Sequence, residues 1–134
     1  MAEHNLDVLL ANMKPELDPE EWVFCSVDPT FPLAVAKPLM VFHEREGTTI
    51  VITATAADHF NLPYEGRWNR ITATIHSALN AVGFIAELAR CLAEQNIPAN
   101  TVSAYHHDHI FVPVNRAGDA LRALDALATS VTRY

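Results

Sequence analysis

The chain has 134 residues, of which half are apolar and 19% are charged, a composition typical of a folded globular protein rather than a disordered one. Its 16 acidic residues outnumber its 9 Lys and Arg residues, giving a formal net charge of −7. Because proteins that bind phosphate backbones present basic faces, we expect no nucleic-acid partner. No stretch approaches the roughly 18 apolar residues of a membrane span, so we also expect no membrane partner.

The two cysteines and the N-terminus indicate the compartment. Cys25 and Cys91 lie far apart, each in an apolar stretch, which favours two buried free thiols over a disulfide. The first 13 residues lack the positively charged start of a signal peptide. We therefore expect a soluble, cytoplasmic protein.

The first half of the chain combines helical and strand patterns. Leu6, Leu9, Leu10 and Met13 recur at helical spacing before Pro15. EWVFCSV is rich in strand formers, whereas PTFPLAVAKP has three prolines and is interpreted as a loop. Gly47 is expected to take a positive φ in a hairpin. The expected elements are a helix at 6–13, strands at 21–27, 38–45 and 48–54, and a short helix at 53–60.

The second half restarts the pattern after Gly66. Ile71, Ala73 and Ile75 alternate with polar residues, as on a half-buried strand. Asn96 is expected to end the helix at 80–95 in a left-handed conformation, and Asn115 is expected to cap the last helix. The expected elements are strands at 67–75, 101–106 and 109–114, the longest helix at 80–95, and a final helix with Ala117, Leu121, Leu124, Ala128 and Val131 facing the core.

The order of elements repeats within the chain. From residue 67 it is β-α-β-β-α, and the earlier half is β-loop-β-β-α, the same unit with its first helix eroded. This weak repeat predicts two packed α+β units over residues 1–64 and 65–134, with antiparallel sheets and helices on one face.

The second half also carries a family resemblance. A strand leads into the run IHSALNAVGFIAEL, with Gly83 opening a helix, and the exit QNIPAN precedes a hairpin and a closing helix. This arrangement resembles the ACT domain, a ferredoxin-like regulatory module that commonly binds amino acids. The whole chain is similar to small bacterial proteins of two ACT-type units in which a hairpin like YHHDHIFVP recurs. Tandem ferredoxin-like units, often paired as a homodimer, are therefore expected.

The loop before Gly83 is the expected ligand site. A glycine at a helix N-terminus lets a ligand approach the backbone, and the unpaired amides there favour a carboxylate. The ligand identity does not carry over, because many ACT loops have an acidic residue and a proline where Asn80 and Val82 stand here. In the alternative interpretation, Gly83 only permits close packing and Ser77 or Asn80 is an N-cap. The predicted contacts are Ser77, Ala78, Leu79, Asn80, Ala81, Val82, Gly83 and Phe84.

Three histidines crowd into the stretch AYHHDHIFVP near the end of the chain. If His107 and Asp108 form a two-residue turn, His106 faces His109 across the hairpin, close enough to share a metal. No metal-binding spacing such as HExxH or paired CxxC accompanies them, and a polar turn is an ordinary outcome. His106 and His109 are therefore predicted to contact the ligand or an interface, with purely structural roles still open, and no metal is expected.

Catalysis is not expected. His76 and Ser77 are adjacent on an extended segment and should point to opposite faces, and no nucleophile elbow, phosphate loop or dinucleotide fingerprint is present. The leading hypothesis is a regulatory protein without cofactor that senses an amino acid or similar small ligand and acts on a partner protein. The alternatives are an assembly module that senses no ligand and a metal protein using His106 and His109.

Overall fold

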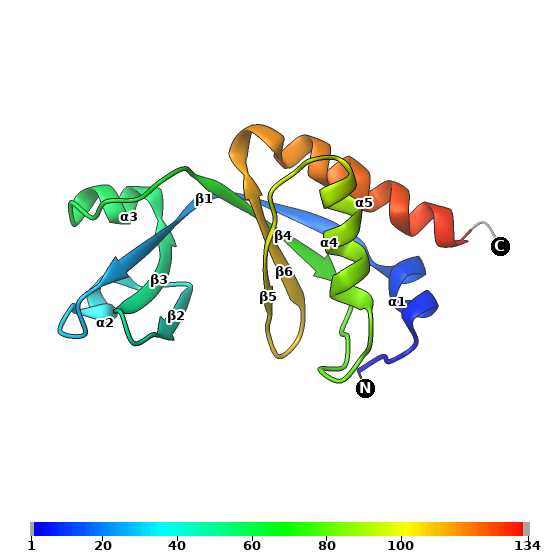
Figure 1. Cartoon of the computed structure of the whole chain (residues 1–134), viewed down its shortest axis with the longest axis horizontal. Coiled ribbons are helices and arrows are strands. Elements are labelled where there is room, and N and C mark those ends of the chain that lie inside the picture. The colour runs from blue at the N-terminus through cyan, green and yellow to red at the C-terminus, as the bar shows by residue number, and fades with distance from the viewer. Residues whose placement is uncertain (1, 133–134) are drawn as a thin grey trace. The chain divides into compact units, whose positions relative to one another are not determined.

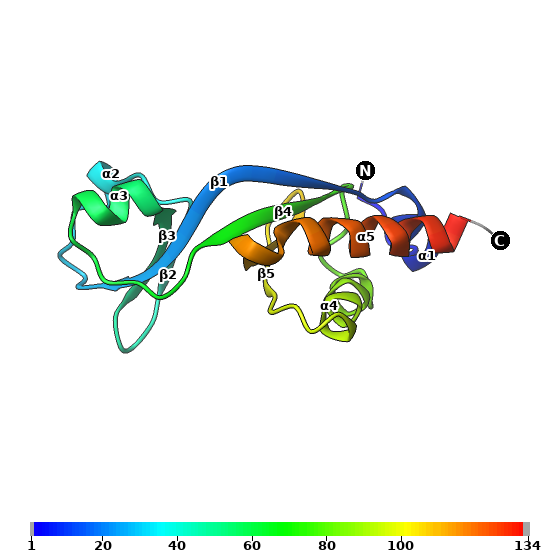
Figure 2. The ribbon, with the colours of Figure 1, turned by 90° about the horizontal axis from the view of Figure 1, so that it is seen from above.

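The computed structural model describes residues 2–132, which form two compact units (Figures 1 and 2). Of the described residues, 2–19 and 69–132 form unit 1, and 20–68 form unit 2. No helix in the described part of the chain is both long and apolar enough to cross a membrane. The elements are α1 (Leu6–Asn12), β1 (Lys14–Val27), α2 (Leu33–Ala36), β2 (Met40–His43), β3 (Thr48–Thr53), α3 (Ala54–His59), β4 (Trp68–Thr74), α4 (Phe84–Glu94), β5 (Asn100–Ser103), β6 (Asp108–Pro113), a 3₁₀ turn (Val114–Arg116) and α5 (Ala117–Thr132).

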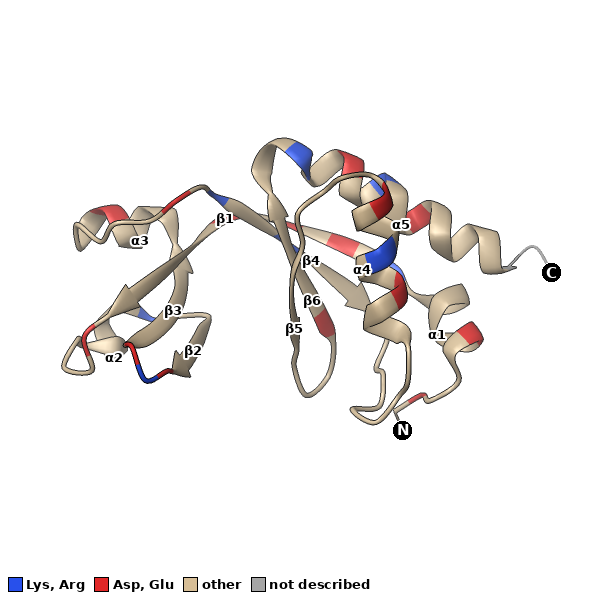
Figure 3. Cartoon of the chain, in the orientation of Figure 1, with Lys and Arg blue, Asp and Glu red and all other residues tan. Residues whose placement is uncertain are grey.

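In unit 1, the helices α1, α4 and α5 and the strands β4 and β6 contribute to one core. The strand order is β1-β4-β6-β5, and Figures 1 and 2 show α4 and α5 on the same side of β4. The alternation predicted for β4 is confirmed, since Ile71 and Ala73 are fully or almost fully buried. The core also contains Leu9, Leu10, Met13, Phe84, Leu88, Leu92, Ile97, Ile110, Val112, Ala117, Ala120, Leu124 and Ala128. On the outer side of α4, Arg90 lies between Glu87 and Glu94 (Figure 3).

Unit 2 has a smaller core around its own antiparallel strands. The order is β2-β3-β1, with Cys25 of β1 opposite Ile50 of β3. Ile50 and Ile52 are fully buried there together with Val23. The predicted hairpin between β2 and β3 is present, but Gly47 has an almost extended φ of 159°. A Cβ at Gly47 would lie only 2.8 Å from Ser26 Oγ, so a side chain at this position would force the Ser26 hydroxyl to move.

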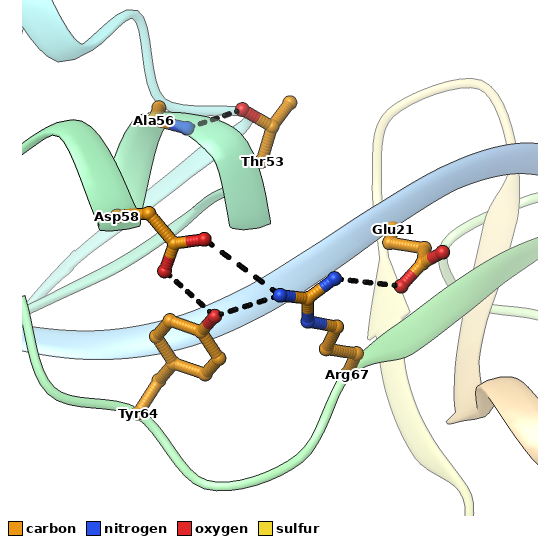
Figure 4. A network of polar contacts seen from close by, with 6 residues as sticks. All are labelled: Glu21, Thr53, Ala56, Asp58, Tyr64 and Arg67. Carbon is orange, nitrogen blue, oxygen red and sulfur yellow. Dashed lines mark hydrogen bonds and ion pairs between the residues drawn. The ribbon is translucent and has the colours of Figure 1, made fainter.

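An exposed polar network in unit 2 connects β1 and α3 with the segment that precedes β4 (Figure 4). Arg67 pairs with Glu21 at 3.3 Å and with Asp58 at 3.7 Å. The Tyr64 hydroxyl accepts from Arg67 at 3.2 Å and donates to Asp58 at 2.8 Å. Because all of these charges face solvent, the network orients the segment before β4 and contributes little to stability.

The predicted fold class, α+β and ferredoxin-like, is confirmed, and several element boundaries differ. The segment expected to be a loop contains the short helix α2, which starts after Pro32, a residue that a first helical turn tolerates. The 80–95 helix begins only at Phe84 because Gly83 is left-handed, so α5 is the longest helix described. Asn115 lies inside the 3₁₀ turn rather than capping α5.

The compact units of the structure cut across the expected repeat segments 1–64 and 65–134. Residues 2–19 belong to the C-terminal unit, because Leu9, Leu10 and Met13 are buried in its core. The beginning of β1 also joins this unit, where Asp18 pairs with Arg70 of β4 at 3.2 Å. An N-terminal segment therefore completes the unit formed by the second half of the chain.

The β5–β6 hairpin has a different register from the predicted one. Ser103 pairs with Asp108 and Val102 with His109, and a four-residue turn at 104–107 closes the hairpin. His106 therefore lies in the turn and does not oppose His109. Along β6, Asp108 shares the core-facing side with Ile110, because side chains alternate on a strand.

His109 lies on the other face of β6. Its Nδ1 is 2.9 Å from Thr72 Oγ1 of β4, one of the polar positions that alternate with the buried residues of that strand. Partial burial, and to a smaller extent the positive charge of Arg70, lowers the pKa of His109. The folded state therefore favours the neutral imidazole.

Replacing Gly83 should destabilise unit 1. Its φ of 93° is unfavourable for any residue with a Cβ, and that atom would lie 3.3 Å from Leu6 Cδ2. We expect Gly83→Ala to lower the free energy of unfolding by about 1–2 kcal/mol in chemical denaturation. Gly118→Ala is the matched control, because Gly118 has helical backbone and ordinary space. It should raise stability by about 0.5–1 kcal/mol, and equal effects of the two variants would contradict this explanation.

The pKa of His109 predicts a pH dependence of stability. Since the unfolded imidazole binds a proton at higher pH than the folded one, stability should fall as the pH drops from about 6.5 towards the folded pKa. Thermal unfolding between pH 7.5 and 5 should therefore show a smaller decrease in Tm for His109→Gln than for the parent protein. His59→Gln, at an exposed position, serves as the control and should keep the parental slope.

Candidate functional site

The candidate site is built on the loop between β4 and α4, which lies wholly within unit 1. The N-terminal arm holds this loop through an isolated parallel bridge between Glu3 and Ser77. The Glu3 N–H donates to the His76 carbonyl at 2.9 Å, and the Ala78 N–H donates to the Glu3 carbonyl at 2.8 Å. Residues more than 70 positions apart in the sequence thus fix the backbone of the loop.

A buried carboxylate connects the loop to the β5–β6 hairpin. Asp108 is only 7% exposed and accepts from the hydroxyl of Ser77 at 3.0 Å and from that of Ser103 at 2.6 Å. The second distance is in the range of a hydrogen bond to an ionised oxygen. Asp108 therefore joins the loop, the end of β5 and the start of β6.

No Lys or Arg side chain of the described structure forms an ion pair with this carboxylate. None of the ion pairs within residues 2–132 involves Asp108. Residues 2–13, 71–89 and 91–115, which include every residue that lines the pockets described below, contain no Lys or Arg. Asp108 is thus a buried carboxylate whose side-chain hydrogen bonds come from two hydroxyl groups.

Two neighbouring pockets open on this loop, and Asp108 lines the smaller of them. The smaller, of about 110 Å³, has Asp108 and both serines in its wall. It is lined by Ser77, Ala78, Leu79, Ala81, Phe84, Ile85, Ser103, Ala104 and Asp108. The larger, of about 540 Å³, is lined by Ala2, His4, His76, Ser77, Ala78, Leu79, Asn80 and Tyr105. The pockets are neighbours, because residues 77–79 line both.

Aromatic rings gather at the larger pocket. The rings of His76 and Tyr105 have centroids 6.4 Å apart and planes inclined by 36°. His106 stands beside both, 5.4 Å from the His76 ring and 4.9 Å from the Tyr105 ring. Tyr105 is 73% exposed, so its ring is accessible to a molecule in this pocket.

The pockets gather most of the predicted loop contacts. Ser77, Ala78, Leu79, Ala81 and Phe84 line the smaller pocket, and Asn80 lines the larger. Val82 and Gly83 line neither, since Val82 is 85% exposed and Gly83 occupies the cap position of α4. Because that cap position is Gly83, neither Ser77 nor Asn80 is the N-cap.

The two histidines named from the sequence line neither pocket. His106 is exposed in the hairpin turn, and His109 is on the face opposite Asp108. Within residues 2–132, no three His, Cys, Asp or Glu side chains are grouped so that they could hold a metal ion. In the observed register His106 lies in the turn and His109 pairs with Val102, so the two imidazoles do not face each other as a shared metal site would require.

Sequence reasoning missed the polar wall of the site. The pattern gives Ser103 only a strand position, it gives Asp108 a place in the turn with at most a share in a metal site with His106 and His109, and it assigns nothing to His4 and Tyr105. For Asp108 a signal existed, because counting back by two from the core residue Ile110 places it on the buried face. Aspartate is almost never fully buried unless its carboxylate is paired.

The equivalent hairpin of unit 2 lacks the charge. β3 and β6 have the same order of buried and half-buried positions, and each begins with a residue that closes its hairpin. In unit 2 the closing pair is His43 and Thr48, where unit 1 has Ser103 and Asp108. Thr48 Oγ1 lies 3.5 Å from His43 Nδ1, so a hydroxyl and an imidazole stand where unit 1 has the buried carboxylate.

Comparison with solved structures identifies relatives of the whole fold. A protein of unknown function from Vibrio cholerae, described as a possible transport protein, is 40% identical over 92% of this chain and 95% of its own, with a TM-score of 0.85. A protein from Agrobacterium tumefaciens is 15% identical over 87% of this chain and 89% of its own, with a TM-score of 0.73.

A regulatory subunit has a similar fold at lower identity. The ligand-free regulatory subunit of aspartate kinase from Thermus thermophilus is 12% identical over 87% of this chain and 98% of its own, with a TM-score of 0.60. No curated protein matches this chain. ACT domain patterns match residues 1–68 and residues 65–126. The chain therefore belongs to the ACT domain family and carries two ACT units in tandem.

Proposed function

We propose that this protein is a sensor that binds an amino acid or similar small ligand on the loop from Ser77 to Phe84 and signals its occupancy to a partner protein. The observation that carries the proposal is the pair of adjacent pockets built on this loop. The loop ends at α4, whose cap residue Gly83 provides no side-chain hydrogen bond. The first amides of α4 are thus available to an acidic group of the ligand, and the helix dipole favours it there.

The chemistry of the site supports binding rather than catalysis. ACT domains are regulatory modules, and the Ser77 hydroxyl donates to Asp108 instead of to a histidine that could activate it. Burial raises the pKa of Cys25 and of Cys91, so neither thiol is poised as a nucleophile. Both cysteines are free, which supports a reducing compartment such as the cytoplasm.

A second candidate function is assembly without sensing. Leu79, Val82 and Tyr105 are apolar or aromatic and 71%, 85% and 73% exposed, and all three belong to the two loops of the site. Such side chains are suited to a protein contact, including the homodimer expected from the resemblance. An assembly module would form an oligomer whose stability is insensitive to small molecules.

A thermal-shift panel of the twenty amino acids separates these candidates. A ligand present at 100 times its Kd adds about 2.7 kcal/mol of stability. For a protein of this size, Tm should rise on the order of 10 °C with at least one amino acid. Ala78→Phe, which fills both pockets, should abolish the shift.

Ala34→Phe is the matched control, because Ala34 is an exposed alanine of α2 in unit 2. It should leave the shift intact. A panel without any shift, combined with a stable oligomer in light scattering, would reject sensing in favour of assembly.

A further inference from the structure

We infer that the ligand of this site carries a primary ammonium group, held by Asp108, joined to a flat ring that lies against Tyr105 and His76. This inference rests on the proposed function and specifies its ligand class. It depends on three features of unit 1: the buried carboxylate of Asp108 with only two hydroxyl donors, the absence of Lys and Arg from the pocket walls, and the rings of the larger pocket.

The first feature is the incomplete coordination of Asp108. An ionised carboxylate offers about four acceptor positions, and the hydroxyls of Ser77 and Ser103 fill two of them. A carboxylate that is 7% exposed and lacks a counter-charge is costly to bury. An ammonium group supplies three donors and a positive charge, so its entry into the smaller pocket would satisfy both needs.

The second feature is the charge of the surroundings. Because residues 71–89 and 91–115 contain no Lys or Arg, a phosphate or a dicarboxylate would meet the negative Asp108 without a basic side chain to balance it. The single acidic group of an amino acid can still bind the free amides of α4. The site is therefore selective for molecules with a cationic group and against those with two or more negative groups.

The third feature is the form of the larger pocket. At about 540 Å³ it has the size of a small-molecule site, and Leu79 and Ala78 make part of its wall apolar. His76 and Tyr105 present rings 6.4 Å apart to the same space. Flat rings pack against each other at centroid distances of about 4.5–7 Å. His76 and Tyr105 are within this range of each other and line the same pocket, so an aromatic group of the ligand in that pocket can contact both rings.

The positions of the two subsites fit one molecule. Residues 77–79 line both pockets, and Ala104 in the smaller pocket is followed directly by Tyr105 in the larger. An ammonium at Asp108 and a ring at Tyr105 are thus separated by a short spacer, as in an aromatic amino acid or amine. In unit 2 the equivalent of Asp108 is Thr48, so we expect one such ligand per chain.

Isothermal titration calorimetry with three matched probes tests the inference on the full chain. L-phenylalanine has the ring, the ammonium and the carboxylate; phenethylamine lacks the carboxylate; 3-phenylpropionate lacks the ammonium. We expect both amines to bind with one molecule per chain and 3-phenylpropionate to bind at least tenfold more weakly than L-phenylalanine. L-alanine, which lacks the ring, should also bind at least tenfold more weakly.

Variants assign each subsite to its residue. Asp108→Asn keeps the shape of the side chain and should weaken both amines at least tenfold while leaving 3-phenylpropionate unchanged. Thr48→Val, at the equivalent position of unit 2, is the matched control and should change no affinity. Tyr105→Ala removes an exposed ring without opening the core, and should weaken phenethylamine several-fold but not L-alanine.

If Asp108→Asn does not fold, Ser103→Ala replaces it in the test. Removing this hydroxyl frees an acceptor position while the charge remains, so the preference for phenethylamine over 3-phenylpropionate should be kept or increased. A loss of that preference would overturn the role of Asp108.

The outcomes separate the inference from the proposed function. Binding of 3-phenylpropionate as tight as that of L-phenylalanine, with Asp108→Asn unchanged, would overturn the ammonium site while sensing stands. Binding of L-alanine as tight as that of L-phenylalanine would overturn the ring subsite. If none of the twenty amino acids and neither analogue binds, the proposed function fails and this inference fails with it.

Discussion

The site of unit 1 depends on the two hydroxyl hydrogen bonds that hold the carboxylate of Asp108. Through Ser77 they position the loop that leads to α4, and through Ser103 they close the β5–β6 hairpin. Glu3 adds the N-terminal arm to the same point by bridging to Ser77. Each of these segments alone would be a surface loop or a strand end. Joined at one buried charge, they form the walls of two pockets.

The part of this fold that the sequence predicts is the part specified by local periodicity. The spacing of Leu88 and Leu92 gives α4, and the alternation of Ile71 and Ala73 gives β4, because each element must turn its apolar side towards a core. The order of these elements in each half was sufficient to predict two α+β units, and the resemblance to ACT domains gave the ferredoxin-like class. The loop proposed to bind the ligand lies between a strand and a helix that are both visible in the sequence.

The features that the sequence did not predict, the start of α4 and the hairpin register, depend on contacts between residues that are far apart in the chain. The start of α4 moves to Phe84 because Gly83 adopts a left-handed conformation beside Leu6, a residue from the other end of the chain. The hairpin register follows the hydrogen bond between Ser77 and Asp108, 31 positions apart. A local rule for polar residues assigns Asp108 to a turn, whereas the tertiary contact places it on the core-facing side of β6.

The two hairpins have the same pattern of buried positions but differ in the polar residue that closes them. β3 and β6 bury the same positions, so both units retain the packing that the fold requires. The residue that closes each hairpin is polar and buried in both units. There Thr48 leaves unit 2 neutral, while Asp108 gives unit 1 a buried charge next to a pocket. A tandem protein can thus keep two similar cores for stability and concentrate recognition in one of them through a single polar position.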